Sequence, residues 1–465
     1  MFVETDHRTH RPHRRDHHTR RRTTRPTGGE FRALGWLARH PLFLLVPAAV
    51  LTAAVLVGWL PTLVTAAVAV GSVAVWGRLH PASFDHTAGP RLRACWRRWT
   101  RYRGRRWSGV LSDCGLAREN HHTGRLVVPR LVRVRSSSRS IDTLYVRLAR
   151  GQDLRTWEQR TEALADALLA HRVAVTRLRP GLLALVVEHT MPFTHTIPAP
   201  PIPTDSTEID LHALDVGDNE HGRPFHLSVL GTHILVAGAT GAGKGSLLWA
   251  PLRALGPAIR DGLVRVRVID LKGGAETSRG VPLFHRYATT MDDALALLTE
   301  ARDDMRARQN HMRDNGLRRL DVSIKHPLDL VVVDELAMLT AYGERAQVRD
   351  ALRLLAEILT QGRACLTTVI GYVQEPSKDV VDVRELFPTR ICLGVTAASH
   401  VDMVLGDGAR ERGALADEIP GDPEHAGIGF VIDTSSRLPV RFRAAHVLDS
   451  EIDELAETCA PEGVA

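Results

Sequence analysis

The chain has 465 residues, of which 44% are hydrophobic, and it carries a formal net charge of +7 at pH 7. This length and composition support two or three domains with a large core, and they exclude a chain that is disordered throughout. The five cysteines stand singly, without the spacing of metal ligands, so a zinc site is excluded and a reducing cytoplasm is favoured.

The positive charge is concentrated at the N-terminal end. Residues 1–106 contain nineteen arginines and five acids, which gives +14, so the rest of the chain carries −7. Residues 1–30 form a low-complexity basic arm that cannot bury a core, and we expect it to be disordered. We interpret the arm as a solvated segment that flanks a membrane, with a DNA-binding tail as the alternative.

A long uncharged segment follows the arm. The thirty-eight residues 40–77 include no Asp, Glu, Lys or Arg, and this is about twice the length of one membrane span. Pro61 interrupts the segment near its middle. We therefore expect a transmembrane hairpin in residues 31–80, with helices at about 41–59 and 62–77. A single kinked span and a buried hydrophobic hairpin are the alternatives.

Basic residues crowd both sides of the expected hairpin. By the positive-inside rule, both termini then lie in the cytoplasm and the chain is a multi-pass protein of the cytoplasmic membrane. Residues 81–124 are rich in Arg and Trp, and we interpret them as a juxtamembrane segment. Contact of this segment with acidic lipid or with DNA is the alternative.

The middle of the chain predicts a small α+β domain over residues 125–191. Strand patterns alternate there with one helical pattern, at 154–171, whose apolar residues lie on one face. No residue in this domain has a catalytic pattern, so we expect an assembly or adaptor module. A proline-rich linker follows at 192–204, and a larger α/β domain follows at 205–448.

The central motif of the larger domain is a buried strand, a glycine-rich turn and the start of a helix, over residues 234–246. Gly238, Gly241 and Gly243 allow a tight turn whose N–H groups point inward, and the positive end of the helix dipole favours a phosphate chain. Lys244 would reach the β- and γ-phosphates of ATP. The residues expected to contact the nucleotide are Gly238, Ala239, Thr240, Gly241, Ala242, Gly243, Lys244, Gly245 and Ser246.

A second apolar strand ends in two acids, Asp334 and Glu335. Asp334 suits the ligand shell of Mg²⁺, and Glu335 suits the polarisation of the attacking water. Gly245 stands where a Ser or Thr usually offers a hydroxyl to Mg²⁺, so Ser246 would replace that ligand only with an adjusted loop end, or water would fill the place. A nucleotide-binding site without turnover is therefore an alternative.

Strand and helix patterns alternate beyond the glycine-rich turn, which predicts a mostly parallel sheet covered on both faces. Ligands bind at the carboxyl ends of such strands, where Lys244, Asp270, Glu335 and Gln374 would converge. A short helix and a tail are expected over residues 449–465.

Residues 236–244, residues 269–276 and the acidic strand resemble the FtsK/SpoIIIE family of double-stranded DNA translocases, and the likeness covers roughly residues 205–455. The resemblance implies a RecA-like P-loop ATPase, hexameric rings and double-stranded DNA in a central channel. It also implies that Gln374 senses the γ-phosphate, although Glu375 replaces the usual arginine after it.

The Lys-Gly-Ser ending of the motif and the two expected spans look most like the TraB-type conjugal transfer proteins of actinomycetes. The family implies an arginine supplied by a neighbouring subunit, for which Arg390 is the first candidate, followed by Arg410 and Arg412. No DNA-reading module fits after the motor, so other transfer proteins or a sequence-reading partner are expected. A protein-secretion ATPase like those of type VII systems, or a scaffold that does not hydrolyse ATP, are the alternative functions.

Overall fold

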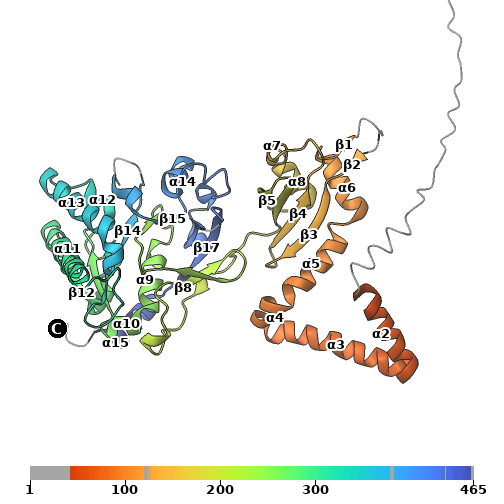
Figure 1. Ribbon diagram of the computed structural model, residues 1–465, viewed down its shortest axis with the longest axis horizontal. Coiled ribbons are helices and arrows are strands. Elements are labelled where there is room, and N and C mark those ends of the chain that lie inside the picture. Colours follow the sequence, from red (N-terminus) through yellow and green to blue (C-terminus); the bar gives the residue numbers. More distant parts are fainter. Residues whose placement is uncertain (1–41, 120–123, 125, 377–381, 435, 462–465) are drawn as a thin grey trace, which may run out of the picture. The chain divides into compact units, whose positions relative to one another are not determined.

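The computed structural model describes residues 42–119, 124, 126–376, 382–434 and 436–461 (Figure 1). The basic arm expected at residues 1–30 lies outside this part of the chain. The chain divides into two compact units, residues 1–84 and 85–465.

The described part of the first unit is helical and largely apolar. Helix α2 spans Leu42–Val57, α3 spans Trp59–Leu79, and α4, Pro81–Thr87, begins in this unit. The break between α2 and α3 falls at Gly58 (φ 101°) rather than at Pro61. Pro61 lies in the first turn of α3, where its missing N–H costs no helical hydrogen bond, so the helix starts before it.

Among the described residues, α3 alone is long and apolar enough to cross a membrane. Helix α2 has 16 residues and its described apolar part is Ala48–Val57, which is short of the about 20 residues that a span requires. The structure therefore supports one possible membrane helix, and the expected pair of spans is not supported.

A small α+β domain begins the second unit. Its antiparallel sheet has the strand order β3-β4-β6-β5, and helices pack against it (Figure 1). The strands are β3 Arg130–Ser136, β4 Ile141–Arg147, β5 Arg172–Arg179 and β6 Leu182–Glu188, with a separate pair of β1 Arg118–Glu119 and β2 Leu126–Val127. The helices are α5 Gly89–Thr100, α6 Gly104–Asp113, α7 Leu154–Glu158 and α8 Thr161–Leu168.

Two features of this domain differ from the sequence interpretation. The single helix expected at 154–171 is divided into α7 and α8, because the backbone leaves helical geometry at Arg160 (φ −116°, ψ 10°). Helix α8 ends at Leu168, before the expected end, because Leu169 has a left-handed backbone (φ 52°). Tyr102 and Trp107, from the expected juxtamembrane segment, are buried in the core of the domain against residues such as Trp157. Part of the Arg/Trp-rich segment is therefore folded.

The larger domain is built on one mixed sheet of eleven strands in the described part of the chain. Its order is β12-β11-β13-β14-β10-β15-β16-β17-β8-β9, with β7 paired to β17. The bounds are β7 Ile197–Pro198, β8 Leu214–Asn219, β9 Pro224–Leu227, β10 Ile234–Ala237, β11 Val264–Ile269, β12 Phe284–Ala288, β13 Leu328–Val333, β14 Thr367–Val373, β15 Thr389–Leu393, β16 Ile428–Ile432 and β17 Pro439–His446.

The expected parallel arrangement holds for six of these strands, from β12 to β15. The sheet then continues with the antiparallel strands β16, β17, β8 and β9, which the sequence interpretation did not include. The sheet is mixed because β8 and β9, which precede β10 in the sequence, and β16 and β17, which follow β15, all extend the sheet beyond β15.

Helices cover both faces of the sheet. They are α9 Lys244–Ala254, α10 Gly256–Arg260, α11 Met291–Asp314, α12 Leu336–Thr340, α13 Arg345–Gln361, α14 Ala398–Leu405 and α15 Asp449–Cys459. Short 3₁₀ turns occupy Ser206–Glu208, Ser278–Leu283, Gly362–Cys365, Asp382–Leu386, Ala416–Glu418 and Pro423–His425. Alternate side chains of each parallel strand enter opposite cores: Ile234 and Val236 pack with α9, α10 and α15, whereas Leu235 and Ala237 pack with α11 to α14. This double burial fixes the carboxyl ends of the strands, where the candidate site lies.

Candidate nucleotide-binding and hydrolysis site

The glycine loop, residues 238–243, links the buried strand β10 to helix α9. Gly241 (φ 79°) and Gly243 (φ 90°) have left-handed backbones that other residues rarely adopt. At Gly243 a Cβ atom would also lie 2.1 Å from the backbone nitrogen of Gly427. Glycine is therefore required there for two independent reasons, one conformational and one steric.

Neighbouring strands hold the glycine loop in place through backbone hydrogen bonds. The Gly238 N–H donates to Val373 O at 3.0 Å, and the Ala239 N–H donates to Gly394 O at 2.8 Å. The Gly427 N–H donates to Ala242 O at 2.9 Å. Gly394 and Gly427 come from far along the chain, and no sequence pattern marked them as part of the site.

Lys244 is the first residue of α9, and its side chain turns back into the glycine loop. Its Nζ lies 2.8 Å from Gly238 O and 3.1 Å from Ala239 O. Burial lowers the pKa of Lys244, and nearby acids such as Glu335 act in the opposite direction. These contacts hold the ammonium where phosphates bound at the start of α9 would meet it.

Asp334 and Glu335, the acid pair, follow β13 and are only 5% and 6% exposed. Lys272 bridges them, with Nζ 3.3 Å from Asp334 Oδ2 and 3.2 Å from Glu335 Oε2. Burial raises the pKa of Asp334, and the ammonium of Lys272 opposes that shift. Burial also acts against the charged form of Lys272, yet attraction to the acid pair raises its pKa. Lys272 lies within residues 269–276, but the sequence predicts no role for it.

Gln374, directly after β14, connects the glycine loop to the acid pair. Its side-chain Oε1 accepts a hydrogen bond from Thr240 Oγ1 at 3.2 Å. Its backbone N–H donates to Glu335 Oε1 at 3.3 Å. A residue with these two contacts can register a change at the phosphates and pass it to Glu335.

Asp270 lies at the same edge of the sheet, but its carboxylate shapes the backbone. It is 1% exposed, and it accepts hydrogen bonds from the Lys272 N–H at 2.9 Å and from Thr277 Oγ1 at 2.6 Å. Of the four residues expected to converge, Lys244, Glu335 and Gln374 thus face the site, and Asp270 orients the loop that carries Lys272.

The groups at this edge fit a magnesium-nucleotide complex. Carboxylate and hydroxyl oxygens are the ligands that Mg²⁺ prefers, and Asp334 and Ser246 offer one of each. Ser246 stands at the third position of α9, with its N–H donating to Gly243 O at 3.1 Å. The role of Ser246 in binding the cation stays a prediction.

The candidate arginines of a neighbouring subunit do not reach this site within their own chain. Arg390 pairs in register with Leu235, away from the carboxyl end of its strand, and contacts Glu385 Oε2 at 3.3 Å. Arg410 donates three hydrogen bonds to Asp417, at 3.0, 3.0 and 2.8 Å. Arg412 donates to the backbone oxygen of Asp407 at 3.0 Å. Their assignment stays a prediction.

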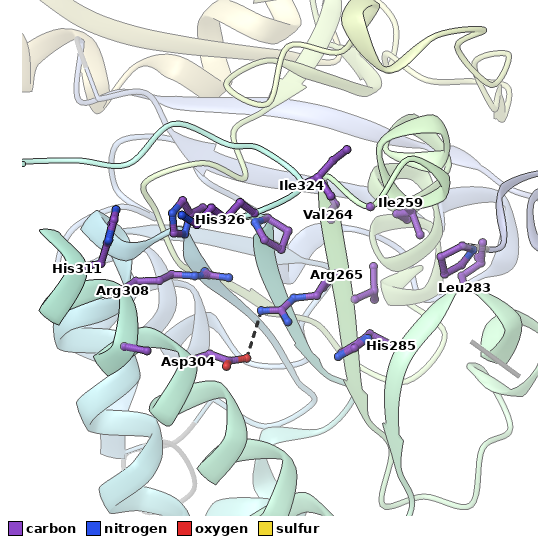
Figure 2. Close-up of a pocket in the computed structure, with 16 residues that line it drawn as sticks. Ile259, Val264, Arg265, Leu283, His285, Asp304, Arg308, His311, Ile324 and His326 are labelled. Carbon is purple, nitrogen blue, oxygen red and sulfur yellow. Dashed lines mark hydrogen bonds and ion pairs between the residues drawn. The ribbon is translucent and has the colours of Figure 1, made fainter. Parts of the chain in front are cut away.

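A cavity of about 490 Å³ lies at the opposite, amino-terminal ends of β11 and β13 (Figure 2). Arg265 contacts Asp304 there at 3.1 Å. Arg265 and Arg308 also contact the fully buried Asp329, at 2.9 and 2.7 Å. Because these arginines already neutralise the buried Asp329 and the partly exposed Asp304, the cavity is lined by a structural ion-pair network, and it is not the nucleotide site.

Comparison with known proteins identifies the domain that carries the site. Residues 213–357 match the sequence profile of the FtsK/SpoIIIE family, and this segment includes the glycine loop and the acid pair. This match covers less than a third of the chain. Residues 213–357 are therefore similar to a P-loop ATPase of the FtsK/SpoIIIE family.

Curated relatives of this ATPase include DNA translocase FtsK of Mycobacterium leprae, which is 27% identical over 250 residues, 49% of this chain and 28% of that protein. DNA translocase FtsK of Tropheryma whipplei is 25% identical over 322 residues, 64% of this chain and 41% of that protein. The chain thus spans less than half the length of these relatives.

Solved structures with a similar course of the chain include the conjugation coupling protein TcpA of pCW3. It has a TM-score of 0.49 and 18% identity, over 75% of this chain and 98% of that chain. The type VII secretion ATPase EccC of Thermomonospora curvata has a TM-score of 0.44 and 23% identity, over 56% of this chain and 32% of that chain.

Proposed function

We propose that the protein is a membrane-anchored motor that uses ATP hydrolysis to move double-stranded DNA. The proposal is supported by the FtsK/SpoIIIE match of the ATPase and by curated relatives that are DNA translocases. The observation that carries it is the convergence of Lys244, the acid pair and Gln374 at the carboxyl edge of the sheet in that ATPase.

Each side chain has a role in the proposed reaction. Lys244 stabilises negative charge on the β- and γ-phosphates, and Asp334 and Ser246 would hold Mg²⁺, which when bound neutralises phosphate charge. Glu335 accepts a proton from water as the water oxygen forms a bond to the γ-phosphorus. The bond from that phosphorus to the β–γ bridging oxygen breaks, and its electrons remain on ADP.

Gln374 is proposed to couple nucleotide state to this proton transfer, because it contacts both Thr240 in the glycine loop and Glu335. Lys272 restrains the same acids and keeps two buried like charges together. Loss of the γ-phosphate would therefore alter the contacts that link Thr240 through Gln374 to Glu335.

We propose a homo-oligomeric ring, most simply a hexamer, in which a neighbour supplies an arginine to the transferred phosphoryl group. Arg390 is the first candidate and Arg410 and Arg412 follow. Of the three, Arg410 is held most firmly, by its three hydrogen bonds to Asp417. Arg390 is partly exposed and, among the described residues, makes one ion pair at 3.3 Å, so it is easier to recruit to a partner.

Helix α3 is the proposed membrane anchor, and conjugative transfer of double-stranded DNA is the proposed setting. The setting rests on the resemblance of the Lys-Gly-Ser sequence to TraB-type transfer proteins. Other transfer proteins or a sequence-reading partner would select the DNA. The motor itself would grip backbone phosphates, so its DNA affinity would fall as salt rises.

The test is the ATPase rate of the full chain in detergent, measured with and without double-stranded DNA, for the wild type and Glu335→Gln. We expect DNA to stimulate the wild-type rate and the variant to lose turnover. An ATPase rate indifferent to DNA but stimulated by a secreted protein substrate would move the function to protein secretion. Absence of turnover would leave a nucleotide-binding scaffold.

A further inference from the structure

A carboxylate faces the position at which the glycine loop lacks a hydroxyl. Gly245 is the second residue of α9, where a Ser or Thr would offer its side chain to the cation. An ideal Cβ atom on Gly245 would lie 3.5 Å from Glu276 Oε2, with no other group outside its own helix backbone and chain neighbours within 4 Å. A carboxylate oxygen of Glu276, from another part of the chain, therefore borders the space next to Gly245.

The loop that carries Glu276 is held by contacts on both sides of it. Asp270 accepts the Thr277 hydroxyl at 2.6 Å, and Thr277 Oγ1 lies 3.0 Å from Tyr287 Oη. Gly274 has a left-handed backbone (φ 80°), and a Cβ there would lie 2.8 Å from Tyr287 Oη. These contacts restrain the backbone beside Glu276, whose exposed side chain extends toward the start of α9.

The charges around Glu276 are those of the nucleotide site. Burial raises its pKa, as does Asp334, while Lys244 and Lys272 lower it. Lys272 is engaged with both acids of the pair. In the described part of the chain, by contrast, Glu276 makes no side-chain hydrogen bond or ion pair. It is the carboxylate of this site that has no protein partner.

We propose that Glu276 is a cation ligand of the bound nucleotide complex, and that one of its oxygens takes the place of the hydroxyl absent at Gly245. The inference rests on the proposed ATP hydrolysis and names a further residue of that site. A carboxylate from the loop after β11 and Asp334 from the end of β13 would then flank the cation. Lys272, which contacts Asp334, would balance the added negative charge.

Gly245 and Glu276 are complementary under this proposal. A side chain at residue 245 would lie in ordinary van der Waals contact with the Glu276 carboxylate, so either group could offer an oxygen to the same place. The plainer alternative is that Glu276 is a solvated loop residue without a role. The two alternatives predict different results when the charge of Glu276 is removed. If Glu276 is a ligand, nucleotide binding weakens only when a divalent cation is present; if it has no role, nucleotide binding does not change.

The experiment measures the dissociation constant of a fluorescent ATP analogue for the full chain in detergent, in Mg²⁺ and in EDTA. For Glu276→Gln we expect the constant to rise at least tenfold in Mg²⁺, in line with losses of about 10- to 100-fold on perturbing cation sites, and to stay unchanged in EDTA. Glu276→Asp, which keeps the charge but shortens the reach, should give an intermediate loss. Glu457→Gln, on the exposed side of α15, is the matched control and should match the wild type in both conditions.

Two further measurements complete the test. Adding Gly245→Ser to Glu276→Gln should restore Mg²⁺-dependent affinity to within a few-fold of the wild type, because the hydroxyl returns. Electron paramagnetic resonance of Mn²⁺ with ADP should show weaker Mn²⁺ binding to Glu276→Gln alone. Unchanged affinity in Mg²⁺, or an equal loss in EDTA, would overturn the proposal. If the wild type showed no cation-dependent nucleotide binding, both the proposed ATP hydrolysis and the role of Glu276 would be wrong. If the wild type binds nucleotide normally and Glu276→Gln does too, only the role of Glu276 is wrong.

Discussion

The Lys272 ammonium lies 3.2 Å from Glu335 Oε2, the carboxylate expected to activate the attacking water. The same ammonium contacts Asp334 at 3.3 Å, so one cation holds two nearly buried acids in place. The acid pair is therefore positioned from β11 as well as from its own strand, through the loop that Asp270 shapes.

Lys272→Met should lower both activity and stability, because it leaves Asp334 and Glu335 as unpaired like charges. Lys272 is 31% exposed, so we expect a loss of about 1 to 3 kcal/mol in the free energy of unfolding, below that of a fully buried pair. Urea denaturation and the ATPase rate measure the two effects. Lys325→Met removes an exposed lysine and should change neither. Wild-type activity in Lys272→Met would show that the bridge is dispensable.

Gly243→Ala should abolish nucleotide binding, whereas Gly241→Ala should weaken it only moderately. Both backbones are left-handed, which costs an alanine about 1 kcal/mol or more. Only at Gly243 does the added Cβ meet the backbone of Gly427; at Gly241 no atom lies within 4 Å of it. Thermal melting with and without nucleotide compares the pair. Equal effects of the two substitutions would contradict the steric role of Gly427.

Gln374→Ala should reduce ATP turnover by about 10- to 100-fold, the scale of a lost positioning contact, and should leave the nucleotide dissociation constant nearly unchanged. The reason is that Gln374 contacts Thr240 and Glu335, not the loop N–H groups that bind phosphate. Thr240→Val removes the donor of the same hydrogen bond and should give a smaller loss of turnover. A large loss of affinity in Gln374→Ala would assign Gln374 to nucleotide binding.

Stability should fall in mild acid because of His233, which is fully buried next to β10. Its Nδ1 accepts the Val369 N–H at 3.0 Å, so the ring must stay neutral there, and burial lowers its pKa from 6.5 to about 4. The unfolded chain takes up a proton below about pH 6.5 and the folded chain only near pH 4. Stability that is fully present above pH 6.5 is therefore lost as the pH falls through this window, by up to about 3 kcal/mol.

His233→Asn tests this assignment because its side-chain oxygen can accept the same N–H but cannot be protonated. Urea denaturation between pH 7 and pH 4.5 should show a weaker pH dependence for the variant than for the wild type. Identical pH dependence in both proteins would show that groups other than His233 cause the loss of stability in mild acid.

Much of the fold could be predicted from the sequence where the signal is local. The long helix α11, Met291–Asp314, has such a signal, since Thr290 caps it and its apolar residues recur at helical spacing. The antiparallel strands β16, β17, β8 and β9 could not be ordered, because strand pairing over such separations leaves no local pattern. The break at Gly58 was likewise hidden, because a proline in a first helical turn resembles one that ends a helix.

The candidate site divides in the same way. The residues near a glycine-rich turn or at the end of an apolar strand, such as Lys244 and Glu335, could be named from their spacing. Lys272, Gly427 and Glu276 could not be given roles, since they reach the site from loops whose course depends on tertiary packing. Such contacts arise between distant segments, and only the folded chain shows them.

The central claim is that ATP hydrolysis at this site moves the protein along double-stranded DNA. The most direct measurement follows the ATP-dependent displacement of a labelled third strand from a triplex on linear DNA, using the full chain in detergent. The account predicts displacement by the wild type, and none by Lys244→Ala or Glu335→Gln at equal DNA binding. ATP hydrolysis by the wild type without any displacement, under conditions where the protein is bound to DNA, would contradict it.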